Sequence, residues 1–228
     1  MKKTTKSSDN NKTEPVRIFS YKMTDDTGFA PNPFKGFMTL ATCKPYIRKT
    51  KKKGDWIAGF TSVALNEDKV GEERLIFLME VTENPVKYSD YWDLKEYQVK
   101  KANMNSKNVE DKTGDNIYKP ISNSTTGFKQ IGTKFHNEVE IIENDLFGEN
   151  VLISQNFYYF GRKPVHIPKK FRPNVPKGST PYGVITDENG NGNKFIKYIQ
   201  LNFKKGIINM PHTWPKENNN INKGKSCK

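Results

Sequence analysis

The stretch 44–53 is the part of the sequence whose composition most directly indicates chemistry. It reads Lys-Pro-Tyr-Ile-Arg-Lys-Thr-Lys-Lys-Lys, with six cationic residues and no acid. As a loop between two strands it would attract phosphate groups, with Arg48 making a directed two-bond contact. Lys44 and Lys49 would add a diffuse attraction, and Tyr46 could stack on a base. The alternative is a solvated lysine loop without a ligand.

Carboxylates and an amide in the loop 25–34 form a second group of candidates. One Gly and two Pro restrict the backbone of this loop. Asp25 and Asp26 could bind a metal or act as acid/base groups, although aspartates in turns more often cap the turn. Asn32 offers both a donor and an acceptor to a base.

Three further residues, Asp115, Cys43 and His136, complete the catalytic candidates. Asp115 and Asn116, in Gly-Asp-Asn-Ile-Tyr, could bond to a base edge, but a turn is the favoured interpretation. Cys43 could form a nucleophilic dyad with His136 or His166, although buried cysteines are commoner than nucleophilic ones. The candidates for catalysis are therefore Asp25, Asp26, Asp115, Cys43 and His136.

An aromatic run, Phe157-Tyr-Tyr-Phe-Gly-Arg162, could supply a stacking surface. Strand alternation sends Phe157 and Tyr159 to one face and Tyr158 and Phe160 to the other. One face is expected to pack in the core, while the other could stack on a base with Arg162 near a phosphate. The residues predicted to bind a nucleotide or nucleic acid are Phe29, Asn32, Phe34, Lys44, Tyr46, Arg48, Lys49, Asp55, Trp56, Asn116, Tyr118, Tyr158, Tyr159 and Arg162.

The composition of the whole chain agrees with an anionic partner. The 228 residues carry a formal net charge of +13, and 12% of them are aromatic. Such a surplus attracts polyanions, although lysines that serve only solubility would give the same total. The sequence holds no phosphate-loop, dinucleotide-binding, nucleophile-elbow or deaminase signature.

The sequence predicts neither a metal nor a cofactor. Two Cys and three His are too widely spread for a zinc site. Residues 187–192 look like half of a calcium loop, but Tyr198 stands where the bidentate Glu belongs. No apolar run reaches the ~18–20 residues of a membrane span, and no secretory signal precedes the domain. We therefore expect a cytoplasmic protein, without a disulfide between Cys43 and Cys227.

Hydrophobic patterns predict more strands than helices. Strands are expected over 16–23, 37–41, 56–60, 75–81, 151–154 and 156–160. A helix is expected over about 90–101, and a second over 195–205, where alternation leaves a strand open. The fold class is therefore α+β, with a mixed, strongly curved sheet or open barrel and one or two packed helices. A single domain, 15–215, would lie between basic tails, 1–14 and 216–228, that we expect to be disordered.

Several segments, taken in order, resemble the nucleotide modification associated domain 2 family. They are Asp26-Thr-Gly-Phe-Ala-Pro-Asn-Pro-Phe34, Thr39-Leu-Ala-Thr-Cys-Lys-Pro-Tyr-Ile-Arg48 and Gly54-Asp-Trp-Ile-Ala-Gly59, followed by Tyr91-Trp92, Gly114–Tyr118 and Val151–Arg162. The resemblance covers about residues 16–170 and implies association with systems that modify bases in DNA. The family often has Cys where this chain has Thr42, which argues against chemistry that needs two thiols. The Gly-Asp-Trp turn is also similar to turns of PUA-like barrels that read modified bases.

Three functions follow from these observations. The favoured one is a non-catalytic reader, whose basic loop holds a backbone while an aromatic pocket accepts a modified base or nucleotide. The alternatives are an enzyme that acts on a modified nucleotide or a base in DNA, and an interaction protein whose charge serves only solubility. The expected partners are DNA or nucleotides and other DNA-modification proteins, but no membrane.

Overall fold

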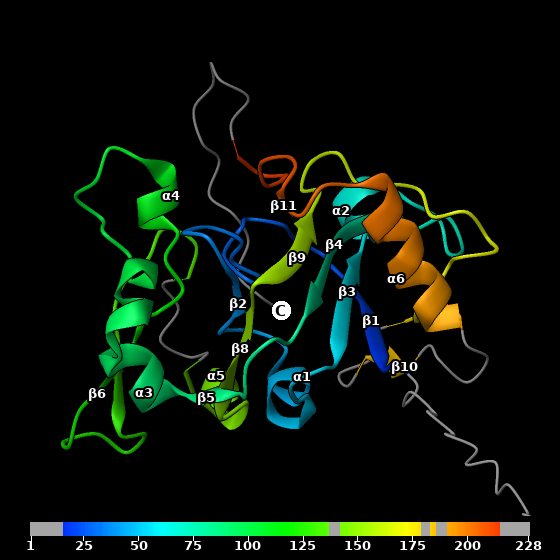
Figure 1. Ribbon diagram of the computed structural model, residues 1–228. Helices are drawn as coiled ribbons and strands as arrows, with labels where there is room; N and C mark the ends of the chain where they lie inside the picture. The colour runs from blue at the N-terminus through cyan, green and yellow to red at the C-terminus, as the bar shows by residue number, and fades with distance from the viewer. Residues whose placement is uncertain (1–15, 137–141, 179–182, 186–190, 215–228) are drawn as a thin grey trace, which may run out of the picture.

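A six-stranded mixed sheet forms the centre of the computed structural model, which describes residues 16–136, 142–178, 183–185 and 191–214 (Figure 1). The strand order is β10-β1-β3-β4-β9-β11. β1 pairs with β3 and β9 with β11 in parallel, and the other pairs are antiparallel. The strands are β1 (Ile18–Lys22), β3 (Trp56–Phe60), β4 (Leu75–Glu80), β9 (Asn156–Tyr159), β10 (Val184–Ile185) and β11 (Gly206–Ile207).

The helix α6 (Asn191–Asn202) covers one face of this sheet (Figure 1). Its buried residues Phe195, Ile196 and Ile199 recur at helical spacing and pack on Trp56 and Tyr158 of the sheet, among others. The apolar stripe therefore decides the helical conformation, and the strand alternative for 195–205 is wrong.

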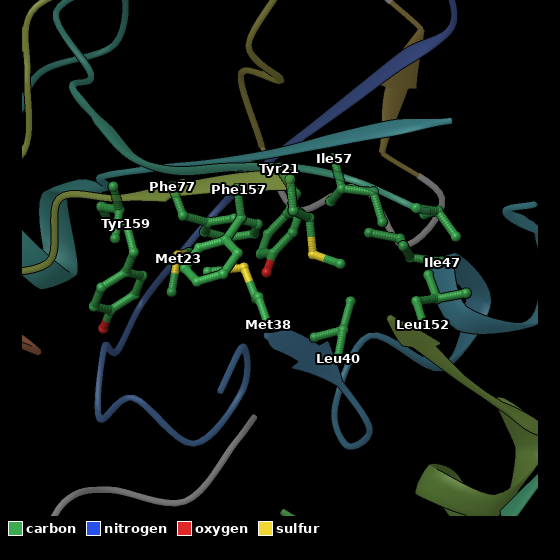
Figure 2. Packing of buried hydrophobic residues seen from close by; sticks show 13 residues of the cluster. Tyr21, Met23, Met38, Leu40, Ile47, Ile57, Phe77, Leu152, Phe157 and Tyr159 are labelled. Atoms are coloured by element: carbon green, nitrogen blue, oxygen red, sulfur yellow. The ribbon is translucent and has the colours of Figure 1, made fainter. Parts of the chain in front are cut away.

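A second, three-stranded sheet covers the opposite face. Its order is β2-β8-β5, with β2 (Met38–Leu40), β8 (Asn150–Ser154) and β5 (Val86–Lys87). Side chains of both sheets meet in a core that includes Phe77 and Ile57 on one side and Met38 and Leu152 on the other (Figure 2). The short helix α1 (Pro45–Thr50) adds Ile47 to this core.

A third hydrophobic cluster lies beyond the second sheet, around Phe29, Tyr91 and Ile117. Short elements surround it, and a hairpin of β6 (Tyr118–Pro120) and β7 (Phe128–Gln130) packs against α3. The other helices are α2 (Val63–Asn66), α3 (Tyr88–Asp93), the 3-10 helix η1 (Lys95–Lys100), α4 (Val109–Lys112) and α5 (Ile142–Phe147). No helix in the described ranges is long and apolar enough to cross a bilayer.

The structure confirms the α+β class and corrects two elements. All six predicted strands are present within two residues of their expected ends. The prediction of a loop over 44–53 is wrong, because residues 45–50 form α1. This helix begins with Pro45 and directs Ile47 into the core. The helix expected over 90–101 is divided into α3 and η1 at Leu94.

Other parts of the predicted architecture remain open. The described strands do not close into a barrel, so the open-barrel and PUA-like readings stay predictions. The predicted tails and most of the calcium-like segment 187–192 lie outside the described residues.

Candidate functional site

Asp26 lies at the centre of a buried polar group that five separate segments build. The hydroxyl of Tyr159, on β9, donates to one carboxylate oxygen of Asp26. The backbone N–H of His212 donates to the other at 3.0 Å. Asp26 is 1% exposed, and these two partners lie 133 and 186 positions away in sequence. We call Tyr21, Asp25, Asp26, Tyr159, Arg162 and His212 the Asp26 cluster.

Burial gives Asp26 an unusual proton affinity. Loss of hydration raises its pKa from an ordinary 3.8 to about 6, while the hydrogen bonds from Tyr159 and His212 work in the opposite direction. Burial, and then the charge of Asp26, raise the pKa of Tyr21 far above its usual range. Both protonation states of Asp26 are therefore accessible near neutral pH, as acid/base chemistry requires.

The two tyrosines belong to one row across the six-stranded sheet. Tyr21 pairs with Gly59, Gly59 with Phe77, and Phe77 with Tyr159. Both hydroxyls point away from that sheet, toward the side of β2 (Figure 2). Gly59 is needed in this row, because a Cβ there would lie 2.2 Å from the ring of Phe77 and 2.7 Å from the sulfur of Met23. The sheet register thus sets the spacing of the two hydroxyls.

Half-buried charged residues form the rim of the cluster. Burial lowers the pKa of His212, and the charge of Arg162 lowers it further, whereas the charge of Asp25 raises it. Burial raises the pKa of Asp25 as well. Among the described residues, the Tyr21 hydroxyl and the Arg162 Nε are buried atoms without a hydrogen-bond partner. Buried polar atoms are normally satisfied, so these two are available to a ligand.

Lys44 approaches the same tyrosine from the start of α1. Its ammonium lies 5.1 Å from the centre of the Tyr21 ring, and burial lowers the pKa of Lys44. Lys44 and Cys43 both have left-handed backbones, with φ of 44° and 53°. Two consecutive non-glycine residues in this conformation are strained, and such strain concentrates at functional sites.

The C-terminal part of the described chain holds the loop of Asp26 in place. Thr213 donates its N–H and its hydroxyl to the carbonyl of Asp26, each at 3.1 Å. The indole of Trp214 donates to the carbonyl of Thr27 at 2.7 Å and stacks on Phe34 at 4.9 Å. Gly28 permits this closure, because a Cβ at its φ of 70° would meet the Pro211 ring at 2.5 Å.

Arg48 belongs to a second buried cluster and is not exposed to a phosphate. Its guanidinium is 0% exposed and donates to the carbonyls of Cys43, Asn150 and Asp145, and to the hydroxyl of Tyr88. Its charge is balanced by the Asp145 carboxylate at 3.5 Å. In this conformation the predicted directed contact of Arg48 with phosphate is therefore replaced by an internal role that joins α1 to α5.

Two further predicted residues surround the same carboxylate. Tyr118 donates to Asp145 Oδ2 at 2.7 Å, and His136 Nε2 lies 3.1 Å from that oxygen. His136 also stacks on Phe29, with ring centres 5.2 Å apart. Cys43 is not a free thiol in the structure, so it does not serve as the nucleophile of a dyad with His136. The prediction that Cys43 and Cys227 form no disulfide involves Cys227, which lies outside the described residues.

Asp115 and Asn32 belong to a third buried cluster around Lys100. The Lys100 ammonium donates to four oxygens at 2.7–3.0 Å, including both oxygens of Asn32. The Asp115 oxygens accept from Tyr91 at 2.8 Å and from Thr39 at 2.5 Å. Burial raises the pKa of Asp115 and lowers that of Lys100, and their mutual attraction opposes both shifts. All these groups are satisfied, so the cluster fixes the loop 25–34 instead of facing a ligand.

The remaining predicted residues are divided among other places. Trp56 and Tyr158 pack under α6, whereas Phe29 packs beyond the second sheet, so these rings do not line one pocket. Asn116 donates to the carbonyls of Tyr91 and Tyr97. The last three residues lie near α1: Asp55 caps the turn after it and pairs with Arg17, Tyr46 packs on Phe147, and Lys49 pairs with Glu149.

In the part of the chain that the structure describes, neither a group of metal ligands nor the hollow beside the β6–β7 hairpin coincides with the Asp26 cluster. Within the described ranges, no three Cys, His, Asp or Glu side chains gather as metal ligands would. A hollow of about 690 Å³ lies beside the β6–β7 hairpin, lined by residues such as Phe128 and Gln130. None of the residues predicted to bind or to catalyse lines it.

The sequence of the chain matches a known protein family. The sequence model of the family described as nucleotide modification associated domain 2 matches residues 15–218, which include all three clusters. The chain belongs to this family. The match also covers residues beyond 170, so the earlier resemblance to nucleotide modification associated domain 2 extends through α6 and the segment that closes over Asp26. No curated protein and no solved structure matches the chain.

Sequence reasoning missed several residues that complete these clusters. Tyr21 lies within a predicted strand, but alternation alone does not distinguish it from its core neighbours. His212 acts through its backbone, for which the sequence has no signal. Lys100 lies in the predicted helix 90–101 and Asp145 lies outside the predicted elements, and charged side chains such as these are ordinarily expected to be exposed to solvent.

Proposed function

We propose that this protein binds a nucleotide, free or within nucleic acid, at the Asp26 cluster as part of a nucleotide-modification system. Membership of the nucleotide modification associated domain 2 family supports the setting. The location of the binding site is supported by two buried atoms without hydrogen-bond partners, the Tyr21 hydroxyl and the Arg162 Nε, in the same cluster as the Asp26 carboxyl, whose pKa is about 6.

The chemistry of the cluster suits the parts of a nucleotide. The guanidinium of Arg162, on the half-buried rim, suits a phosphate. The Asp26 carboxyl and the Tyr21 hydroxyl suit donors and acceptors on a base edge. This assignment moves the proposed site from the basic stretch 44–53 to the region between the two sheets, and it retains Lys44, Asp25, Asp26, Tyr159 and Arg162 among the predicted residues.

A binding titration tests the proposal. Unmodified and base-modified deoxynucleoside monophosphates, and short oligonucleotides that contain them, are titrated into wild-type protein and Asp26→Asn. We expect one member of the panel to bind wild type and to lose at least about tenfold in affinity in the variant, since one charge-assisted hydrogen bond contributes ~1.5–3 kcal/mol. Asn fits the same space, and its amide can still meet the Tyr159 hydroxyl and the His212 N–H.

The matched control is Asp93→Asn, which removes an exposed carboxylate on α3. It changes the net charge by the same amount and should leave binding unaltered. Equal affinity of wild type and Asp26→Asn for every ligand that binds would contradict the proposal. Failure of the whole panel to bind the wild type would also count against it.

The raised pKa of Asp26 favours a second candidate, an enzyme that acts on the bound nucleotide. If Asp26 acts as a general base, turnover should rise as pH increases through about 6, because the carboxylate form then becomes dominant. Chromatography of the bound nucleotide after incubation separates the candidates, since a reader leaves it unchanged. A product that Asp26→Asn forms at the wild-type rate would exclude this role for Asp26.

A further inference from the structure

The outward face of α6 carries lysines without acidic neighbours in its sequence. Lys194, Lys197 and Leu201 recur at helical spacing opposite the buried stripe, and all three are exposed. Lys204 and Lys205 continue the exposed cationic surface beyond the helix end. Because the buried stripe packs against the sheet, the opposite side of α6, which carries Lys194 and Lys197, faces solvent.

A second lysine-bearing segment is fixed beside α6. Phe171 stacks on Tyr198 of the helix, with ring centres 4.8 Å apart and planes 19° from parallel. Lys169 and Lys170 precede Phe171, and both are exposed. We call the surface formed by Lys169, Lys170, Lys194, Lys197, Lys204 and Lys205 the lysine surface.

The two segments that carry the lysine surface contain no acid in their own sequence, although Glu73 approaches the first of them through its ion pair with Arg172. Residues 150–178 and 191–214 contain no Asp or Glu, where the chain's average would give about six. None of the six lysines forms an ion pair within the described residues, whereas Lys22, Lys35 and Lys49 elsewhere do. The acids Asp187 and Glu188 lie outside the described residues. A general excess of lysine would not produce this separation.

We propose that the lysine surface docks on the phosphate backbone of double-stranded DNA. Lysines are point charges that suit sequence-independent phosphate contacts. A membrane fits less well, because the apolar stripe of α6 is buried and Leu201 is the large apolar residue on its exposed face. Single strands also fit less well, because they are held by free aromatic faces, and here Phe171 and Tyr198 stack on each other.

This inference goes beyond the nucleotide site and does not depend on it. The lysine surface would place the protein on a duplex without reading its sequence, while the Asp26 cluster would take the nucleotide. A variant of the lysine surface that loses duplex binding but still binds the nucleotide would show that the two sites act independently. A variant of the Asp26 cluster that loses only nucleotide binding would show the same.

The test measures duplex binding by fluorescence anisotropy over a range of salt concentrations. The double variant Lys194→Glu/Lys197→Glu is compared with Lys52→Glu/Lys53→Glu, which changes two exposed lysines in the turn between α1 and β3. Both change the net charge equally. We expect the α6 variant to lose about tenfold or more in affinity and about two units of salt slope, and the control to stay within about threefold.

Further controls make the result unambiguous. Circular dichroism verifies that both variants fold, and Lys194→Gln/Lys197→Gln repeats the test without charge reversal. A single strand of equal length and vesicles of phosphatidylserine and phosphatidylcholine serve as competing ligands. Equal losses in the two Glu variants, an unchanged α6 variant, or tighter binding to single strands or vesicles than to the duplex would each overturn the proposal.

Discussion

At the scale of single residues, the sequence indicates which chemical groups are present but not what surrounds them. Asp26 was singled out as a polar group in a restricted loop, and the structure gives it partners at residues 159 and 212. Arg48 was chosen for phosphate because of its charge, and it is internal. Composition shows that a cation is present, but the direction of its side chain depends on tertiary packing.

Asp26 should make the stability of the protein depend on pH. The folded state raises its pKa from 3.8 to about 6, so it retains a proton that the unfolded chain releases. The free energy of unfolding should therefore fall by ~2–3 kcal/mol from this group as pH rises from 4 to 6. In Asp26→Asn this fall should vanish. Urea denaturation at several pH values checks it, and a difference between variant and wild type that stays constant with pH would refute it.

At the scale of elements, strands were easier to predict than the short helix α1. Strands such as β3 and β9 are short apolar runs bounded by turn residues, and this signal does not depend on distant contacts. In α1, four of the six residues are charged or carry a hydroxyl, and its buried side includes Arg48. Such a helix carries little amphipathic signal, because its inward face is itself partly charged.

The guanidinium of Arg48 should contribute strongly to the attachment of α1 to α5. Arg48→Met would remove the guanidinium donor from the carbonyls of Cys43 and Asp145, and it would leave the buried Asp145 carboxylate without the cation that balances its charge. We expect a loss of ~3–5 kcal/mol in the free energy of unfolding. The neighbouring Lys49→Met is the matched control, because its ion pair with Glu149 is solvent-exposed and should contribute little to stability. Equal midpoints in chemical denaturation would contradict this.

At the scale of the whole molecule, the sheet order and the return of the chain to residue 26 were beyond sequence reasoning. The parallel pairing of β1 with β3 requires partners 38 positions apart, such as Ile18 and Trp56. The closure by residues 211–214 is made largely by backbone groups and a single indole. Neither the parallel strand pairing nor this closure leaves a periodic pattern in the sequence. The fold class could therefore be predicted, but the order of the strands and the contacts of residues 211–214 could not.

Trp214 should hold that closure together. Trp214→Ala removes the stack on Phe34 and the bond to the carbonyl of Thr27. We expect a loss of ~2–4 kcal/mol in stability and faster hydrogen exchange at the His212 and Thr213 amides, whose acceptors are on Asp26. Exchange measured by mass spectrometry provides the readout. Unchanged protection of residues 208–214 would show that the indole does not secure the closure.

The distance in sequence between Asp26 and its last partners has a consequence for synthesis. The loop of Asp26 is made early, but the amides of His212 and Thr213 lie 186 and 187 residues later. At ~5–20 residues per second, a ribosome needs roughly 10–40 s to supply them. During that interval the nascent chain carries Asp26 without the groups that enclose it, so the cluster is completed only after residue 213 has been made.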